Sequence, residues 1–342
     1  MLFCIESSFV CQSYLDLELP KQPAYKERVP EAVMGPVSAA TRYCAVLGHP
    51  IKHSASPAMQ NAGIAALELD WRYLAFEVHP EDLRKVIEGA KAMKFIGLNL
   101  TVPHKLLAME MVDALDETAK TWGAVNTIRF EARDGTGKWQ PLAEIGGEMP
   151  REIRAVGFNT DADAIARSLK DDLDVKLAGA KVLLLGAGGA GRVAALKLAS
   201  EGVAELHLVN RTMEKAEALA TEIRSRYVKV KVSAGYSGDG KVALDLLLNA
   251  TSLGLKPGDD SPLDERKFAV GRARAVYDMI YRPAETELLK AAKAAGCRTA
   301  NGLGMLLHQG ARALELWSGK AAPLAAMRDA LVENIYGGKR HV

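Results

Sequence analysis

Cysteine is scarce in this sequence of 342 residues, which contains only Cys4, Cys11, Cys44 and Cys297. None of the four belongs to a CxxC pair, and no histidine stands at the spacing that zinc ligands use. A zinc site and a disulfide scaffold are therefore not predicted. Scattered cysteines of this kind are typical of a reducing compartment, so we expect a cytoplasmic protein.

Long apolar runs and an excess of one charge are also lacking. No run of about eighteen apolar residues is present, so no membrane-spanning helix is predicted. Lysine and arginine (44) nearly balance aspartate and glutamate (42), and the two signs are mixed along the chain. No basic tract indicates nucleic acid or an anionic membrane as a partner, although a small anionic ligand is compatible with this composition.

Length and composition indicate a globular protein with room for two domains. Hydrophobic residues make up 49% of the chain and charged residues 25%, and the length allows two separate cores. Residues 1–40 contain four prolines and lack the pattern of a secretory signal or a transit peptide. We expect these residues to form a loosely ordered extension.

Strands and helices alternate from Tyr43 onward, which indicates an α/β fold with a largely parallel sheet. In the first unit we expect strands at 43–47, 71–78, 95–100 and 124–130, and helices at 57–67, 80–93, 105–115 and 117–121. Glycine and proline interrupt residues 134–154, so this stretch is expected to be a loop or hairpin insertion.

A second unit of the same kind follows at about 165–300. Helices are expected at 161–169 and 192–200, and strands at 182–185, 205–209, 228–232, 243–249, 275–278 and 298–299. Two terminal helical patterns, 302–317 and 323–334, are expected to return to the first unit.

A glycine-rich loop follows the apolar strand 182–185 directly and precedes the helix 192–200. Its residues are Gly186, Ala187, Gly188, Gly189, Ala190 and Gly191. A strand that ends in such a loop places free backbone N–H groups and the positive end of a helix where a pyrophosphate can lie. The loop therefore predicts a dinucleotide site, and a tight turn without a ligand is the alternative.

The end of the next strand, 205–209, favours one nicotinamide cofactor over the other. Folds of this type usually carry an acidic residue there, about twenty residues after the loop, for the ribose 2′-hydroxyl. This chain has Asn210, Arg211 and Thr212 instead. A guanidinium without a neighbouring carboxylate favours the 2′-phosphate of NADP. Lys215, one helical turn further, is either a second cation for the phosphate or a solvated surface lysine.

Polar residues follow the strands of the first unit, where a cleft facing the cofactor is expected. After the first strand, Ser54 and Ser56 can bind a carboxylate, but Ser56 before Pro57 can also be a helix cap. After the third strand, Lys105 can give a proton to a carbonyl oxygen while hydride reaches the carbon, and His104 is a rival acid. A free lysine titrates at about pH 10.4, and burial lowers this value whereas a neighbouring carboxylate raises it.

Two further residues, Asn126 and Asp161, can bind substrate hydroxyls. Asp161 can also orient Lys105 as its charged partner. The alternative is local: Asn126 is a turn residue, and Asp161 or Thr160 caps the helix that follows.

Taken in order, these motifs resemble the shikimate dehydrogenase family, from Tyr43 to about Leu331. The matching segments, all in family order, are 54–57, 99–105, 123–127, 159–161, 186–191, 210–212, 249–254, 281–283 and 301–302, with Met305 and Gln309. The resemblance implies an α/β protein of two domains. Residues 41–164 together with 301–336 would bind substrate, and residues 165–300 would form a Rossmann-type NADP domain.

The family's activity is the reversible, NADPH-dependent reduction of 3-dehydroshikimate to shikimate, in the pathway to chorismate and the aromatic amino acids. The resemblance implies this activity for the chain, with no metal required. Lys105 and Asp161 would form the catalytic pair. The implied substrate-binding residues are Ser54, Ser56 and Tyr281 for the carboxylate, and Asn99, Thr101, Asn126, Asp161 and Gln309 for the remainder. Beside the glycine loop, the implied cofactor-binding residues are Asn210, Arg211, Thr212, Lys215, Thr251, Met279 and Gly302.

Three other functions stay open at this point. A quinate/shikimate dehydrogenase of the same family would more often carry an acid in place of Asn210–Thr212 and use NAD. A non-catalytic sensor of NADPH or shikimate would not need both Lys105 and Asp161. A folate-linked dehydrogenase shares the two-domain plan but not the substrate motifs. A monomer or a homodimer is expected, and the insertion 134–154 is hypothesised to lie near the cleft because it joins two substrate motifs.

Overall fold

The structure is a computed structural model that describes residues 35–146, 150–236, 243–256 and 258–337. The extension predicted for residues 1–40 therefore lies outside the described residues, except for residues 35–40. Within the described residues, no helix combines the length and the apolar character needed to cross a bilayer.

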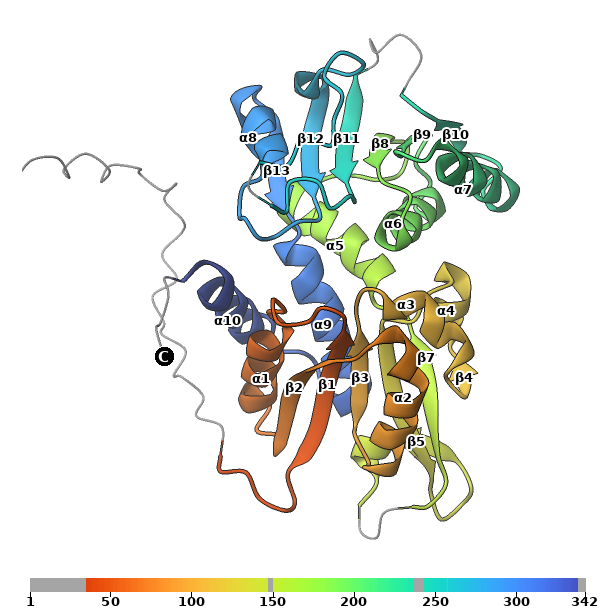
Figure 1. Cartoon of the computed structure of the whole chain (residues 1–342), viewed down its shortest axis with the longest axis vertical. Coiled ribbons are helices and arrows are strands. Elements are labelled where there is room, and N and C mark those ends of the chain that lie inside the picture. Colours follow the sequence, from red (N-terminus) through yellow and green to blue (C-terminus); the bar gives the residue numbers. More distant parts are fainter. Residues whose placement is uncertain (1–34, 147–149, 237–242, 257, 338–342) are drawn as a thin grey trace, which may run out of the picture. The chain divides into compact units, whose positions relative to one another are not determined.

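The first half of the chain folds around a mixed sheet with strand order β2-β1-β3-β5-β7-β4, in which β6 pairs with β5 (Figure 1). Its strands are β1 (Arg42–Gly48), β2 (Trp71–Glu77), β3 (Gly97–Leu100), β4 (Ala114–Leu115), β5 (Thr127–Arg133), β6 (Trp139–Pro141) and β7 (Ile153–Phe158). β1, β2 and β3 are parallel, whereas β5 runs antiparallel to both β3 and β7. The expected parallel arrangement is thus correct for β1 to β3 and wrong for β5.

The helices of this half are α1 (Ser56–Ala66), α2 (Leu83–Ala92), α3 (His104–Leu107) and α4 (Glu117–Trp122). Alternating residues of β1 serve the two faces of the sheet, as the pleat of a strand requires. Ala45 and Leu47 pack with α2 residues such as Ile87, whereas Val46 packs with Met59 of α1. Because both faces are covered, β1 reads as a nearly continuous apolar run.

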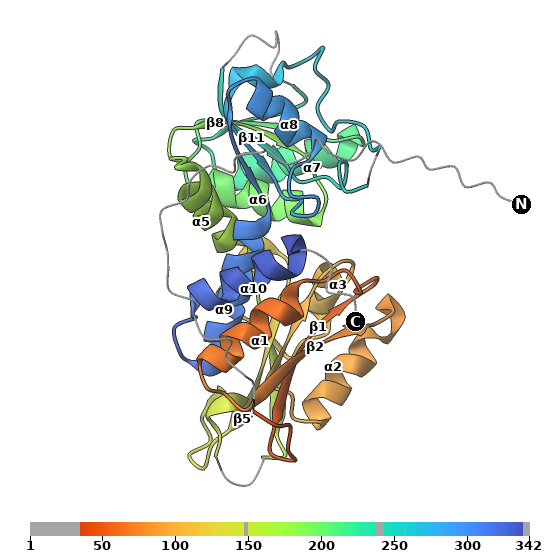
Figure 2. The same cartoon turned by 90° about the vertical axis from the view of Figure 1, so that its left-hand side faces the viewer.

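The C-terminal helices α9 (Leu303–Ser318) and α10 (Leu324–Tyr336) pack against α1, as Figures 1 and 2 show. Gly63 of α1 permits this approach, because a Cβ there would lie 2.8 Å from Leu314 Cδ2. Trp317 is fully buried, and its indole N–H donates to the C=O of Ile128 on β5 at 3.0 Å. The expected return of the chain to the first sheet is confirmed.

A second, wholly parallel sheet has strand order β10-β9-β8-β11-β12-β13. Its strands are β8 (Lys181–Leu185), β9 (Glu205–Val209), β10 (Lys231–Ala234), β11 (Leu244–Asn249), β12 (Ala273–Asp278) and β13 (Arg298–Asn301). The helices are α5 (Asp161–Leu173), α6 (Gly189–Ser200), α7 (Met213–Arg226) and α8 (Glu287–Ala294). The strand order reverses between β8 and β11, and sheets of this kind bind dinucleotides at the carboxyl ends of such strands.

Several expected elements differ from the structure. The single helix expected at 105–115 is instead α3, a 3₁₀ turn at 108–110 and the short strand β4. The strand expected at 228–232 lies two to three residues later, as β10, and the strand expected at 124–130 begins at Thr127. β7 and α8 were not expected at all.

The described residues of the insertion, 134–146 and 150–154, do not lie beside the cleft, so this hypothesis is wrong for them. Thr127 pairs with Phe158 and Ala132 with Ile153, so β5 and β7 share one register along their length. The described residues after β5 and before β7 therefore lie at the strand ends opposite to those that carry Asn126 and Asn159. β6 belongs to this segment and extends β5 as a hairpin.

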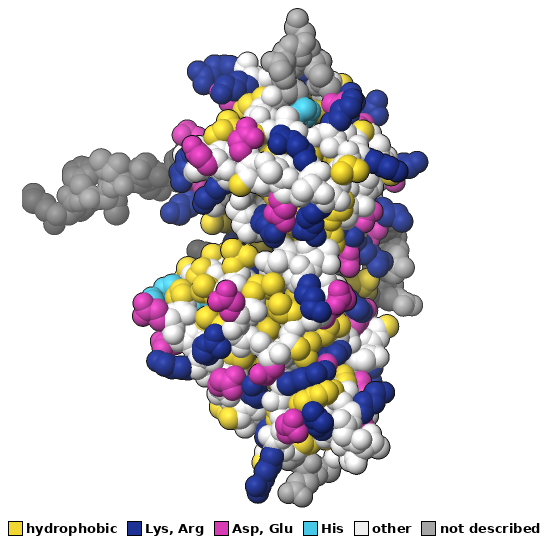
Figure 3. Space-filling model, turned by 90° about the vertical axis from the view of Figure 1, so that its right-hand side faces the viewer, with side chains coloured by type: hydrophobic (Ala, Val, Ile, Leu, Met, Phe, Trp, Pro, Cys, Tyr) yellow, Lys and Arg dark blue, Asp and Glu magenta, His cyan; other side chains and the backbone are white. Residues whose placement is uncertain are grey.

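On the face that Figure 3 shows, basic and acidic side chains are interspersed with apolar ones. This face presents no extended field of one sign.

Candidate active site

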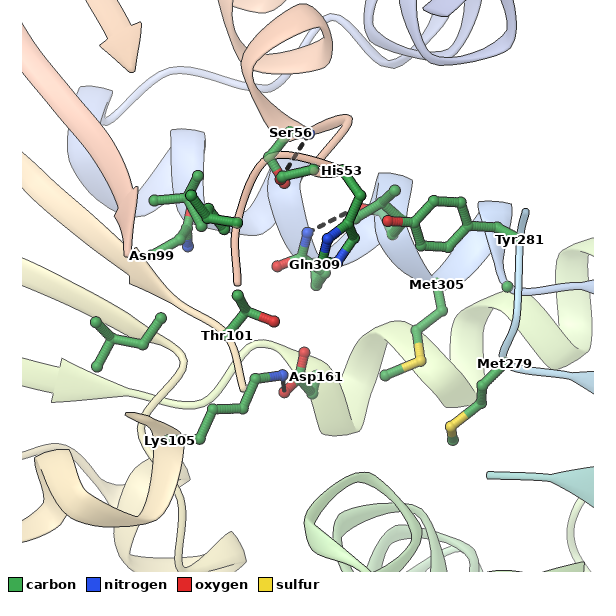
Figure 4. A pocket seen from close by; sticks show the side chains of 16 residues that line it. His53, Ser56, Asn99, Thr101, Lys105, Asp161, Met279, Tyr281, Met305 and Gln309 are labelled. Carbon is green, nitrogen blue, oxygen red and sulfur yellow. Dashed lines mark hydrogen bonds and ion pairs between the residues drawn. The ribbon is translucent and has the colours of Figure 1, made fainter. Parts of the chain in front are cut away.

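One pocket collects side chains from the ends of β1 and β3, from α5 and α9, and from the segment after β12 (Figure 4). Eight of the nine residues expected to act on substrate line it: Ser54, Ser56, Asn99, Thr101, Lys105, Asp161, Tyr281 and Gln309. Met279 and Gly302, expected to bind cofactor, line it as well, as does His53, which had been assigned no role. The ninth residue, Asn126, is 1% exposed and does not line the pocket, but it donates to the carboxylate of Asp161, which does.

Lys105 and Asp161 form an ion pair in this pocket. Lys105 Nζ donates to Asp161 Oδ2 at 2.7 Å, and the two side chains are 29% and 8% exposed. Asn126 Nδ2 donates to the other carboxylate oxygen, Oδ1, at 2.8 Å. Each oxygen of Asp161 therefore has its own donor, which fixes the orientation of the carboxylate.

The position of Asp161 depends on a helix cap that neither Asp161 nor Thr160 supplies. Asn159 Oδ1 accepts the N–H groups of Asp161 and Ala162, both at 3.1 Å. Asn159 Nδ2 donates to the C=O of Ala124 at 3.0 Å. The capping role considered for Asp161 or Thr160 is wrong, because Asn159 satisfies these first donors of α5 and leaves the Asp161 carboxylate to Lys105.

Register brings the amide residues together at one end of the first sheet. Asn99 of β3 pairs with Thr127 of β5, which in turn pairs with Phe158 of β7. Asn99 Nδ2 donates to Thr127 Oγ1 at 3.0 Å, and Asn99 Oδ1 accepts from the Tyr73 hydroxyl at 2.7 Å. The amide of Asn99 is thus fixed by buried partners.

The serine motif lies at the start of α1. Ser54 Oγ accepts the N–H of Ser56, the first residue of α1, at 3.3 Å, and Ala55 at the cap position has no side-chain acceptor. The alternative that Ser56 caps the helix is therefore wrong, since Ser56 already belongs to the first turn. Both serines line the pocket.

Two other polar side chains of the pocket have defined environments. Burial raises the pKa of Tyr281, so its phenol stays neutral and can donate a hydrogen bond near neutral pH. Gln309 Nε2 donates to the C=O of Leu306 at 2.9 Å, one turn earlier in α9 (Figure 4). His104, the rival acid, is fully buried and does not line the pocket, and burial lowers its pKa.

The glycine loop has the shape that a dinucleotide requires. Gly186 has φ +106°, and a Cβ on Gly191 would lie 2.1 Å from the carbonyl oxygen of Gly186, so both positions need glycine. Gly188 and Gly189 have nothing within 4 Å of where a Cβ would stand. This open space over the first turn of α6 fits the close approach of a pyrophosphate to backbone N–H groups.

Asn210 connects the glycine loop to the segment after β9. Its Oδ1 accepts the N–H of Ala187 at 3.0 Å, and its Nδ2 donates to the C=O of Thr212 at 2.8 Å. Asn210 thus organises the loop, while the side chains of Arg211 and Lys215 are exposed at the start of α7. The residues present fit a 2′-phosphorylated cofactor.

Thr251 and Gly302 lie close to other parts of the backbone. Thr251 Oγ1 donates to Asn249 Oδ1 at 2.8 Å, and Thr251 Cγ2 would be 3.1 Å from a Cβ on Gly186. A Cβ on Gly302 would lie 2.0 Å from the Met279 carbonyl oxygen, so packing also requires glycine at Gly302.

The strand order, the glycine loop and the polar pocket together define a two-domain α/β oxidoreductase that uses a dinucleotide. Residues 46–128 match the shikimate dehydrogenase substrate binding domain. Residues 166–236 match the shikimate / quinate 5-dehydrogenase family, and residues 302–332 the shikimate 5′-dehydrogenase C-terminal domain. The chain belongs to the shikimate dehydrogenase family.

Relatives match the chain over nearly their whole length. The shikimate dehydrogenase (NADP+) of Methanopyrus kandleri is 40% identical over 304 residues, which are 87% of this chain and 98% of the relative. A shikimate dehydrogenase crystallised with NADP+ is 35% identical with a TM-score of 0.73, over 88% of this chain and 99% of that chain. The Thermus thermophilus enzyme, solved with NADP(H) and shikimate, is 34% identical with a TM-score of 0.70, over 86% and 99%. The expected family and α/β fold are confirmed.

Proposed function

We propose that this protein catalyses the reversible, NADPH-dependent reduction of 3-dehydroshikimate to shikimate, in the pathway to chorismate and the aromatic amino acids. The observation that carries the proposal is the ion pair of Lys105 and Asp161 in a pocket with hydroxyl and amide groups. The relatives named shikimate dehydrogenase (NADP+), and the related structures that contain NADP and shikimate, support the substrate and the cofactor.

Hydroxyl groups that line the pocket are assigned to the carboxylate of the substrate. Ser54, Ser56 and Tyr281 can each donate to a carboxylate oxygen, and the neutral phenol of Tyr281 avoids repulsion of that charge. Thr101, Asn99 and Gln309 are assigned to the ring hydroxyls. Asn126 acts through Asp161, because its amide is already hydrogen-bonded to that carboxylate.

Lys105 exchanges the proton at the reacting oxygen. When bound, NADPH supplies hydride to the carbonyl carbon. Lys105 gives one ammonium proton to the carbonyl oxygen, so that the C=O bond becomes an alcohol, and in the reverse direction the amine takes the proton back. Lys105 then recovers its proton from solvent, which reaches the side chain because it is 29% exposed. Asp161 holds the amine in place through its hydrogen bond to Lys105 Nζ.

Cofactor binding is assigned to the glycine loop and to the residues around it. The N–H groups of Gly186 and Ala187 already donate within the protein, so the backbone N–H groups from Gly188 to Gly191 would receive the pyrophosphate. Arg211 would pair with the 2′-phosphate, assisted by Thr212 and Lys215. Asn210 holds the two segments together. Thr251, Met279 and Gly302 are placed on the nicotinamide side, since Met279 and Gly302 also line the substrate pocket.

We assign residues 41–164 with 301–336 to a substrate domain and residues 165–300 to the NADP domain. The packing of α9 and α10 on α1 supports this division. A cytoplasmic location is proposed because Cys44 and Cys297 are free thiols in the described part of the chain. We further propose a monomer or homodimer that acts on small molecules rather than on nucleic acid.

Product analysis tests this function. Purified protein with 3-dehydroshikimate and NADPH should form shikimate in an amount equal to the NADPH consumed. Absence of shikimate under these conditions, with a folded protein, would refute the proposal. The Ser56→Ala variant should raise the KM for shikimate without changing that for NADP, since this hydroxyl is assigned to the acid and not to the cofactor.

A further inference from the structure

Two arginines of the second half of the chain hold the C-terminal end of α4 in the first half. Arg192 Nη1 donates to the C=O of Trp122 at 2.7 Å, and Arg226 Nη2 donates to the C=O of Thr121 at 2.8 Å. The last carbonyl groups of a helix have no partner within the helix and carry partial negative charge. Two guanidinium groups therefore satisfy acceptors that would otherwise depend on water.

Glu222 of α7 fixes both guanidinium groups. Its Oε1 lies 2.7 Å from Arg192 Nη2 and 3.0 Å from Arg226 Nη1, and its Oε2 accepts from Arg192 Nε at 3.2 Å. The three side chains are 31%, 30% and 32% exposed for Arg192, Glu222 and Arg226. A bidentate, partly shielded contact of this kind restricts the arginine far more than a single exposed ion pair does.

The segment that Arg192 holds leads directly to the proton-transfer pair. Gly123 follows Trp122 with φ +64°, and a Cβ there would lie 2.9 Å from Arg192 Nη1. Three residues further, Asn126 donates to the carboxylate of Asp161. Arg192 is thus connected to the substrate pocket through a short stretch of backbone.

At its other side, Arg192 belongs to the cofactor loop. It directly follows Gly191, and its backbone N–H donates to the C=O of Gly188 at 2.7 Å in the first turn of α6. A cation at this position of the sequence would be expected to face the pyrophosphate, but its guanidinium is occupied by Glu222 and Trp122. Trp122 and Ala124 also pack in the same apolar cluster as Val193 of α6.

We propose that Arg192 is a positioning residue that couples cofactor binding to the substrate pocket. A dinucleotide on the loop fixes the first turn of α6, Arg192 transmits this constraint to the turn after Trp122, and Asn126 transmits it to Asp161. The proposal rests on the proposed function and adds a structural link between the cofactor site and the substrate site. Bound NADPH should then tighten the binding of shikimate, and the reverse should hold by linkage.

Calorimetric titration measures this coupling without turnover, because NADPH and shikimate are both reduced. The ratio of the Kd for shikimate without and with saturating NADPH is compared in wild type, Arg192→Gln and Arg192→Lys. We expect a wild-type ratio of about fivefold or more, a ratio near one in Arg192→Gln, and an intermediate ratio in Arg192→Lys. The Kd for NADPH alone should be unchanged in both variants.

Matched controls separate coupling from charge and from stability. Arg224→Gln removes an arginine of α7 that donates to the C=O of Val232 on β10, so it should keep the wild-type ratio. Arg192→Gln with Glu222→Gln restores the net charge and should still lack coupling. If Arg192→Gln does not fold, Glu222→Gln alone tests the contact between Arg192 and Glu222. The ratio of the two Kd values for shikimate in Glu222→Gln should then fall below that of wild type.

A wild-type ratio of one, or a ratio in folded Arg192→Gln equal to that of Arg224→Gln, would overturn the coupling. Either result leaves the proposed function intact if wild type oxidises shikimate with NADP. A wild type that binds no shikimate and turns none over overturns the function itself.

Discussion

Replacing Lys105 by methionine should lower kcat by about a thousandfold, the middle of the range for loss of a general acid. The substitution keeps the apolar stem of the side chain and removes only the amine that lies 2.7 Å from Asp161 Oδ2. Asp161 retains its hydrogen bond from Asn126 at 2.8 Å, so the carboxylate stays in place. A thousandfold loss corresponds to about 4 kcal/mol of transition-state stabilisation, whereas the KM for shikimate should change much less.

The assay is steady-state oxidation of shikimate by NADP, with unfolding curves to show that each variant is folded. Asp161→Asn should lower kcat by a similar factor. The double variant should have a kcat no lower than that of the less active single variant, because the pair acts as a unit. Lys120→Met is the matched control, since Lys120 pairs with Glu117 at 2.8 Å on the surface of α4, with its side chain 56% exposed. A kcat of Lys105→Met close to that of the control would refute the role of Lys105.

Three further predictions concern the cofactor, the helix cap and pH. Arg211→Ala should raise the KM for NADPH about 10–150-fold, because hydrogen bonds to a charged phosphate are lost. The KM for NADH should stay nearly unchanged, and equal effects on the two cofactors would contradict the 2′-phosphate contact. Asn159→Ala should lower the free energy of unfolding by about 1–2 kcal/mol in urea titrations, because α5 loses its cap, and an unchanged midpoint would contradict this. Burial lowers the pKa of His104, so on acidification the histidine is protonated in the unfolded chain before it is protonated in the folded protein. The stability that this residue contributes is therefore present above about pH 6.5 and is lost as the pH falls. His104→Leu should reduce the slope of the free energy of unfolding against pH on the acid side by up to about 1.4 kcal/mol per pH unit, and parallel curves for the variant and wild type would contradict this.

Local patterns predicted the glycine loop and the segment after β9, whereas Thr251, Met279 and Gly302 were expected only from the family resemblance. A strand, a glycine loop and a helix are contiguous in sequence, and the positions of Gly186 and Gly191 follow from backbone geometry alone. The strand order of the second sheet and the exposed Arg211 agree with that reading. The substrate residues were placed by their resemblance to a family, since an isolated lysine or asparagine carries no such local signal.

Contacts between distant segments were beyond sequence reasoning. β7 contains charged and glycine residues, so its alternation is weak, and only its pairing with β5 shows why it is a strand. Asn159 stands beside Asp161 and Thr160 in sequence, and which of the three caps α5 depends on the C=O of Ala124 that holds its amide. The bond from Arg192 to Trp122 joins residues seventy positions apart, and no periodic pattern encodes it.

The absorbance of reduced nicotinamide, measured with shikimate or quinate and with NADP or NAD in all four pairings, tests the substrate and the cofactor of this protein together. We expect rapid reduction with shikimate and NADP, and little with the other three pairings. Preferred turnover of quinate with NAD would contradict the assignment of Arg211 and of the substrate, and no reduction in any pairing by folded protein would contradict the catalytic role of the pocket.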